Sequence, residues 1–138
     1  MKRGNNIATA FVQGYEMQGS NLYSFGDICR SYSTVIASKE KGYILLTCYN
    51  YSNTTQRHKL HIRRAARQEA VKLFEVPICY NWHGLTSDQH EKNVSYLMEK
   101  AETMKAKADR ARTKKAFYKL QEEKYRQAEE DYTNIFQL

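Results

Sequence analysis

The sequence is poor in residues that interrupt or cross-link a chain. It has one proline, Pro77, six glycines and three cysteines among 138 residues. Cys29, Cys48 and Cys79 are odd in number and irregularly spaced, so they predict no disulfide framework and favour a reducing compartment. No stretch approaches the roughly 20 apolar residues that a membrane span needs, and no apolar run follows the basic N-terminus as in a signal peptide. We therefore expect a cytoplasmic protein with no membrane association.

Sequence signals for catalysis and for metal binding are also sparse. The sequence has no glycine-rich phosphate loop, zinc-finger spacing, helix-turn-helix pattern or nucleophile motif. The nearest metal-like pairs are Cys79 with His83 and His58 with His61, and neither has the spacing of a zinc site. We predict no catalytic activity, no metal and no cofactor.

Positive charge dominates what is present. Lys and Arg total 22 against 15 Asp and Glu, which gives a net charge of +7 and a pI of about 9.3. This balance favours an acidic partner, either nucleic acid or an acidic protein face. The alternative is that the charge only keeps the chain soluble. The length suits one domain.

Short apolar or β-branched segments predict strands in the first third of the chain. They are residues 7–13, 34–38 and 43–49, with a further short strand around 22–25. The polar turn 39–42 ends in glycine and predicts a β-hairpin between two of them. We expect an α+β fold in which one helix covers a small antiparallel sheet.

Residues 54–73 predict that covering helix, because they follow residues of N-cap type and lack glycine and proline. Six Lys or Arg against two Glu fall in residues 54–75. The apolar stripe expected to face the sheet consists of Ile62, Ala65, Ala66, Ala70 and Leu73. Two basic rows are expected on other faces, Arg57 with His61 and Arg64, and Lys59 with Arg63 and Arg67.

A helical tail is predicted after a connector or short edge strand at residues 74–80, which Pro77 keeps off a central position. Thr86 and Gln89 form a capping-box pattern, and no Gly or Pro interrupts the chain from there to 132. The division is therefore 1–80 for the sheet and basic helix and 81–138 for the tail, within a single domain. A heptad-like seam occupies only the first half of the tail: Val94, Leu97, Ala101, Met104, Ala108 and Ala111.

Three arrangements of the tail stay open. It is one long helix, two helices broken near 109–114, or a homo-oligomeric coiled coil through residues 88–132. Charge separates within it, because residues 100–119 hold eight basic and two acidic side chains, whereas 120–138 hold two basic and five acidic ones.

The basic helix and the lysine-rich tail supply the candidate binding residues, since Lys and Arg neutralise phosphates. Tyr49, Tyr51 and Trp82 would add stacking to a single-stranded target. The alternative is a charged face that only contacts solvent. The candidates are Arg57, Lys59, Arg63, Arg64, Arg67, Lys105, Lys107, Arg110, Arg112, Lys114 and Lys115.

Residues 21–64 contain Ser-Tyr-x-Thr-x-Ile-Ala, a hairpin, and then Tyr-Ser-x-Thr-Thr-x-x-His. The matching positions are Ser31, Tyr32, Thr34, Ile36, Ala37, Tyr51, Ser52, Thr54, Thr55 and His58. This pattern resembles small bacteriophage and mobile-element proteins. The resemblance implies a phage or plasmid origin rather than a chemistry.

The second half of that pattern also has a structural interpretation as a strand-to-helix junction. Hydroxyls in it would satisfy the first free N–H groups of the helix, and His58 would fix the loop. A small-ligand or phosphate site at the helix N-terminus is the alternative. The junction residues are Tyr51, Ser52, Thr54, Thr55 and His58.

The sequence supports three alternative hypotheses of function. The first is a phage or mobile-element binding protein that engages nucleic acid or a host nucleoprotein through its basic face. The second is an anti-defence inhibitor of the anti-CRISPR type that binds a host protein complex. The third is a structural or assembly protein that oligomerises through its tail.

Overall fold

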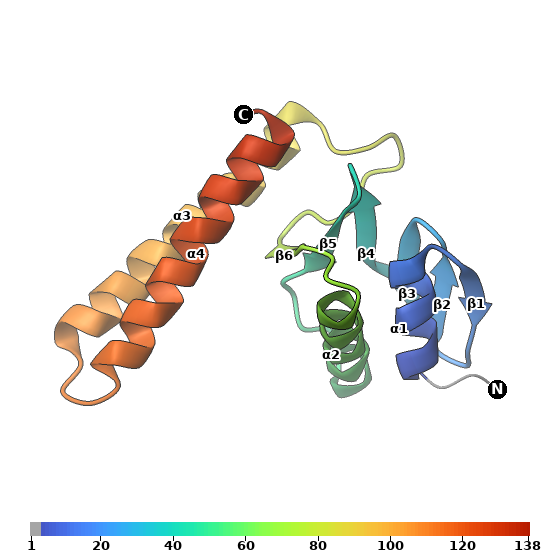
Figure 1. Ribbon diagram of the computed structural model, residues 1–138, viewed down its shortest axis with the longest axis horizontal. Helices are drawn as coiled ribbons and strands as arrows, with labels where there is room; N and C mark the ends of the chain where they lie inside the picture. The colour runs from blue at the N-terminus through green and yellow to red at the C-terminus, as the bar shows by residue number, and fades with distance from the viewer. Residues whose placement is uncertain (1–3) are drawn as a thin grey trace. The chain divides into compact units, whose positions relative to one another are not determined.

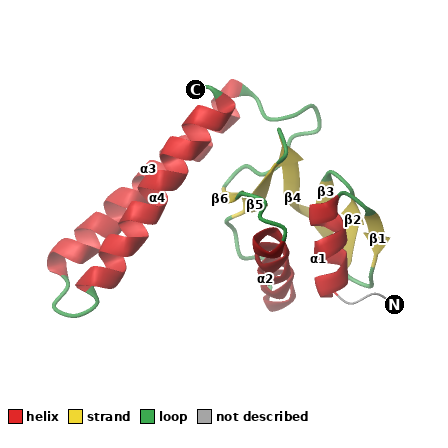
Figure 2. Cartoon of the chain, in the orientation of Figure 1, coloured by secondary structure: helices red, strands yellow, loops and turns green. Residues whose placement is uncertain are grey.

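The computed structural model describes residues 4–138, which form two compact units divided between Leu85 and Thr86 (Figures 1 and 2). The first unit combines a sheet with two helices and the second is a pair of helices, so the α+β class is confirmed. The division falls after the predicted residue 80 because the connector packs on the first unit. Ser38 Oγ donates to the carbonyl of Cys79, and the Leu85 N–H donates to Glu40 Oε1 at 3.0 Å.

Six strands form one mixed sheet. Neighbours from β1 to β5 are antiparallel, whereas β6 lies parallel to β5. The prediction of a wholly antiparallel sheet is therefore wrong at this edge, because the helix between β5 and β6 carries the chain back to the same end of the sheet. The strands are β1 Glu16–Gln18, β2 Leu22–Phe25, β3 Ile28–Ser31, β4 Thr34–Glu40, β5 Tyr43–Thr47 and β6 Leu73–Val76.

Two helices, α1 (Gly4–Gln13) and α2 (Asn53–Gln68), lie beside the sheet (Figure 1). Both share a hydrophobic core with it. The prediction of a strand at 7–13 is wrong. Ile7, Ala8, Phe11 and Val12 are buried at helical spacing, and they pack with Leu46 in one cluster. The sheet is therefore covered by two helices rather than one.

The predicted β4–β5 hairpin is confirmed, with a tighter turn than expected. The loop has two residues, Lys41 and Gly42, with φ of 52° and 82°. Left-handed conformations at both positions are typical of the two-residue turns that match strand twist. Strand β4 therefore extends through Glu40.

Helix α2 ends five residues earlier than predicted, at Gln68. Ala70 adopts the left-handed conformation (φ 54°), and the Val71 N–H donates to the Ala66 carbonyl at 2.9 Å. This is the hydrogen-bond pattern with which helices commonly end at glycine. Leu73, predicted in the apolar stripe of the helix, instead begins β6.

The second unit is a helical hairpin of α3 (Ser87–Arg110) and α4 (Lys115–Phe136) (Figure 1). The break falls at residues 111–114, within the region predicted for the two-helix arrangement. The capping box is confirmed, since the Gln89 N–H donates to Thr86 Oγ1 at 3.2 Å. Leu97, Ala101 and Ala108 of the predicted seam are buried, so the seam packs α3 on α4 within one chain.

Candidate nucleic-acid interface

Two arginines and a histidine lie on the face of α2 that borders α1. Arg57, His61 and Arg64 follow one another at four- and three-residue spacing, which places them on one side of the helix. Arg57, Arg64 and the nearby Arg67 are exposed, and none forms an ion pair with an acidic side chain in residues 4–138. Burial lowers the pKa of His61, and the charges of Arg64 and Arg57 lower it further. Arg57 and Arg64 therefore create a positive field in which His61 favours its neutral form.

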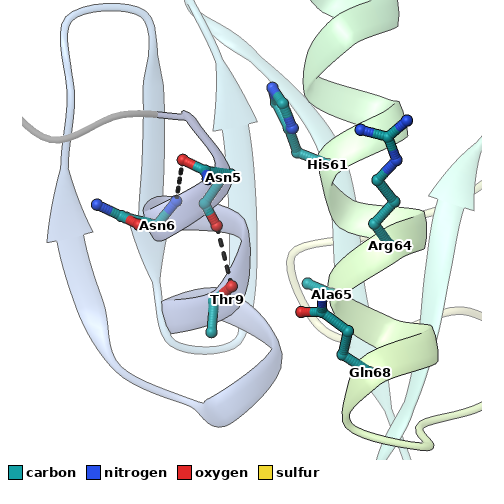
Figure 3. A pocket seen from close by; sticks show the side chains of 7 residues that line it. All are labelled: Asn5, Asn6, Thr9, His61, Arg64, Ala65 and Gln68. Carbon is teal, nitrogen blue, oxygen red and sulfur yellow. Dashed lines mark hydrogen bonds between the residues drawn. The ribbon is translucent and has the colours of Figure 1, made fainter.

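A polar groove of about 260 Å³ separates this face from the start of α1 (Figure 3). Its lining includes amides, a hydroxyl, an imidazole and a guanidinium but no carboxylate. The N-terminal turn of α1 adds the partial positive charge of a helix start and contains no acidic residue. The groove is therefore suited to anionic oxygen. It is lined by Asn5, Asn6, Thr9, His61, Arg64, Ala65 and Gln68.

Lys59 and Arg63 point to the opposite side of α2, towards the sheet edge. Lys59 is only 1% exposed, and its Nζ donates to the Tyr49 carbonyl at 3.1 Å and to Asn50 Oδ1 at 3.3 Å. Arg63 Nε donates to Oε1 of Glu75, whose Oε2 lies 3.8 Å from Lys59 Nζ. The prediction that Lys59 belongs to a solvent-exposed basic face is wrong, because its ammonium instead fixes the helix to the sheet. Arg63 is half-buried in the same contact.

A second basic cluster lies at the tip of the helical hairpin. The six predicted residues there are all exposed: Lys105, Lys107, Arg110, Arg112, Lys114 and Lys115. Helix α4 begins at a left-handed Lys114 with no side-chain cap and no acidic residue in its first turn. Lys107 Nζ lies 5.9 Å from the centre of the Tyr118 ring. The tip therefore combines exposed cations with a helix start that has no side-chain cap.

The predicted junction forms a closed hydrogen-bond network. The Thr55 N–H donates to Oγ of the N-cap Ser52 at 3.1 Å, and Ser31 Oγ lies 3.0 Å from Thr55 Oγ1 and 2.7 Å from His58 Nδ1. His58 thus contacts the end of β3, not the loop as predicted. The hydroxyls are engaged within the protein, which favours the structural interpretation over a phosphate site. Two predicted members lie outside this network, Tyr51 and Thr54.

The structure shows the aromatic side chains that were predicted to stack on a ligand, and two others that were not predicted. Tyr49, Tyr51 and Trp82 are exposed, as a stacking role requires. The sequence prediction missed Tyr23 and Phe25, which lie on β2 beside an arginine of the neighbouring strand. The alternation of residues in β2 indicates that Tyr23 and Phe25 share one face of the sheet. The sequence does not show that Arg30 lies opposite them, because that depends on which strand pairs with β2 and in which register.

The part of the chain that the structure describes gathers no group of three or more His, Cys, Asp or Glu suited to a metal. Cys79, one member of a metal-like pair, directs its thiol to the Val35 carbonyl at 3.7 Å. None of the described helices combines the length and apolar character needed to cross a membrane.

Comparison with known proteins gives a family but no function. A model of a family of unknown function, DUF8033, matches residues 2–73, which are 72 of the 138 residues. That segment holds α1, α2 and the groove between them, but not the helical hairpin. No curated protein and no solved structure matches the chain. The chain belongs to the DUF8033 family.

Proposed function

We propose that this chain is a binding protein without catalytic activity that engages nucleic acid, alone or within a nucleoprotein. The contact would be made by the face of α2 that carries Arg57, Arg64 and Arg67. The observation that carries the proposal is the exposure of Arg57, Arg64 and Arg67 without an acidic partner in residues 4–138. Lys59 and Arg63, by contrast, are held by contacts within the protein.

The spacing of these arginines suits an extended polyanion. Arg57 and Arg64 are seven residues apart, which corresponds to about 10 Å along a helix axis. The groove beside Arg64 offers further donors and no carboxylate. A ligand with several phosphates would therefore contact the helix face and the groove together, and each neutralised phosphate would release counterions.

The hairpin tip supports the same function as a second polyanion contact. Its six cations and the uncapped start of α4 suit phosphate oxygens. The resemblance to phage and mobile-element proteins extends the proposal to action in the cytoplasm of a bacterial host. Inhibition of a host defence complex would use the same surfaces, on a guide or target strand or on an acidic protein face.

The experiment is fluorescence anisotropy with a labelled duplex, titrated with protein between about 50 and 200 mM salt. A triple variant, Arg57→Gln, Arg64→Gln and Arg67→Gln, should weaken binding and flatten the plot of log affinity against log salt by about two to three units of slope. The matched control is Arg126→Gln, which also removes an exposed arginine but one paired with Glu122 and Glu102.

Equal binding by the triple variant and the Arg126 control would overturn the proposal. Capture of a single host protein that survives nuclease treatment would favour the inhibitor instead. Thermal unfolding of each variant establishes that the fold is intact.

A further inference from the structure

A second surface of the first unit lies on the side of the sheet opposite α1. Side chains alternate along a strand, and Leu22 and Ser24 of β2 are buried on the α1 side. Tyr23 and Phe25 therefore point to the other face, where Tyr23 is half-buried and Phe25 is 40% exposed. Their rings lie nearly parallel, 6.5 Å apart with an interplanar angle of 21°.

Arg30 of β3 completes this surface. It is the cross-strand partner of Tyr23, and its guanidinium carbon lies 5.3 Å from the Tyr23 ring centre and 5.2 Å from that of Phe25. The two rings therefore hold a planar cation at the face of the sheet.

The charge of Arg30 is not neutralised by any carboxylate in residues 4–138. Its Nε is buried and has no hydrogen-bond partner among the described residues. Glu16, opposite Phe25 on β1, is exposed and forms no ion pair with Arg30 in the described structure. Internal packing thus accounts for the position of the guanidinium but leaves its charge uncompensated.

The ligand that complements this surface has a flat apolar face next to a negative charge. An unpaired nucleobase with its flanking phosphate has both properties, and bases stack on aromatic rings and on guanidinium planes. A base within a duplex already has both faces covered by its neighbours. We propose that Tyr23, Phe25 and Arg30 form a stacking surface for unpaired bases, so that the partner is a single-stranded nucleic acid.

This inference rests on the proposed function, and it adds a strand preference that the arginines of α2 do not supply. Phosphate contacts alone act on single strands and duplexes alike. The stacking surface would act only on the single strand.

The test compares a labelled single strand of about 12 nucleotides with the duplex of the same sequence at one salt concentration. Phe25→Leu keeps the apolar bulk and removes the ring, so it should weaken single-strand binding about five-fold or more and leave duplex binding unchanged. Arg30→Lys keeps the charge and removes the planar group, so it should weaken single-strand binding while the salt slope stays constant. Glu16→Gln removes the carboxylate of the residue opposite Phe25 and should strengthen single-strand binding.

Arg64→Gln is the control, because it should weaken binding to both forms. Phe25→Leu and Arg30→Lys variants that bind the single strand like the parent would overturn the inference while leaving the proposed function in place. Absence of binding to either form by the parent protein would overturn the proposed function and the inference with it. Thermal unfolding of Phe25→Leu shows whether its weaker binding comes from loss of the fold. The stronger binding expected for Glu16→Gln cannot be explained by unfolding.

Discussion

Arg63 of α2 donates a hydrogen bond from Nε to the carboxylate of Glu75 on β6. The same carboxylate lies 3.8 Å from the buried Nζ of Lys59, one turn earlier on the helix. One acid at the sheet edge therefore engages two of the five Lys and Arg residues predicted for the basic helix face. This contact fixes the rotation of α2 about its axis, and that rotation leaves Arg57 and Arg64 on the side that borders α1.

Glu75→Gln should lower the free energy of unfolding by about 1 to 3 kcal/mol, because the buried ammonium of Lys59 loses its nearest negative charge. Urea denaturation followed by circular dichroism measures the loss. Glu102→Gln is the control, since Glu102 pairs with Arg126 on an exposed surface and such pairs contribute little. A Glu75 variant as stable as the control would show that the contact does not hold the helix to the sheet.

The stability should fall as the solution becomes acidic. Burial lowers the pKa of His58 below 6.5, and the nearby His61 lowers it further. The unfolded chain then binds more protons than the folded one below about pH 6.5, so stability is complete above that pH and decreases as the pH falls through the folded pKa. Urea unfolding near pH 7.5 and near pH 5 measures the difference. In His58→Gln, the free energy of unfolding should differ less between the two pH values. If the difference is the same as in the parent protein, groups other than His58 cause the pH dependence.

Tyr132→Phe should destabilise the helical hairpin by about 1 to 3 kcal/mol. The Tyr132 hydroxyl accepts from Asn93 Nδ2 at 2.9 Å and lies 2.7 Å from His90 Nδ1, and all three side chains are buried. The substitution removes this shared partner and keeps the ring, which lies 4.6 Å from the ring of Phe136. Thermal unfolding measures the effect against Tyr118→Phe, a half-buried tyrosine at the other end of the hairpin. Equal melting temperatures would contradict the prediction.

The three cysteines should differ in their reaction with iodoacetamide. Burial raises the pKa of the Cys29 and Cys79 thiols to about 12, so both are protonated as well as shielded near neutral pH. Cys48 is half-buried and should be alkylated first. Mass spectrometry of the folded protein should find modification at Cys48, with the other two reacting after denaturation. Equal rates at all three positions in the folded protein would show that the core opens readily.

Local sequence patterns predicted those parts of the fold that depend on nearby residues. The Thr86 capping box and the β4–β5 hairpin need only adjacent side chains. The break before α4 was one of three arrangements that the sequence left open. The strand predicted at 7–13 was wrong because a short, mostly apolar segment fits the helical and the strand period alike. Packing in the core that α1 shares with the sheet favours the helix. The end of α2 could not be predicted, because the left-handed position after the helix is occupied by Ala70 rather than by the glycine that usually marks such an end.

The candidate site was predictable only to the level of composition. Arg57, Lys59, Arg63 and Arg64 are all basic residues on one helix, and no local signal distinguishes those that contact solvent from those that contact the sheet. The distinction depends on Glu75, which reaches the helix only after β6 pairs beside β5. The surface around Arg30 likewise depends on cross-strand register.

The parallel pairing of β6 also determines when the first unit is complete during synthesis. Ile44 pairs with Leu73, so this ladder joins residues 29 positions apart in the chain (73 minus 44). Pairings between residues so distant in sequence form later than hairpins, because the intervening chain must first be ordered. On the ribosome, β1 to β5 can pair as successive hairpins while they emerge. The contact between Lys59 and Glu75 can form only after Glu75 has left the exit tunnel. The nascent chain therefore has an exposed sheet edge beside β5 until β6 has left the exit tunnel and paired with β5.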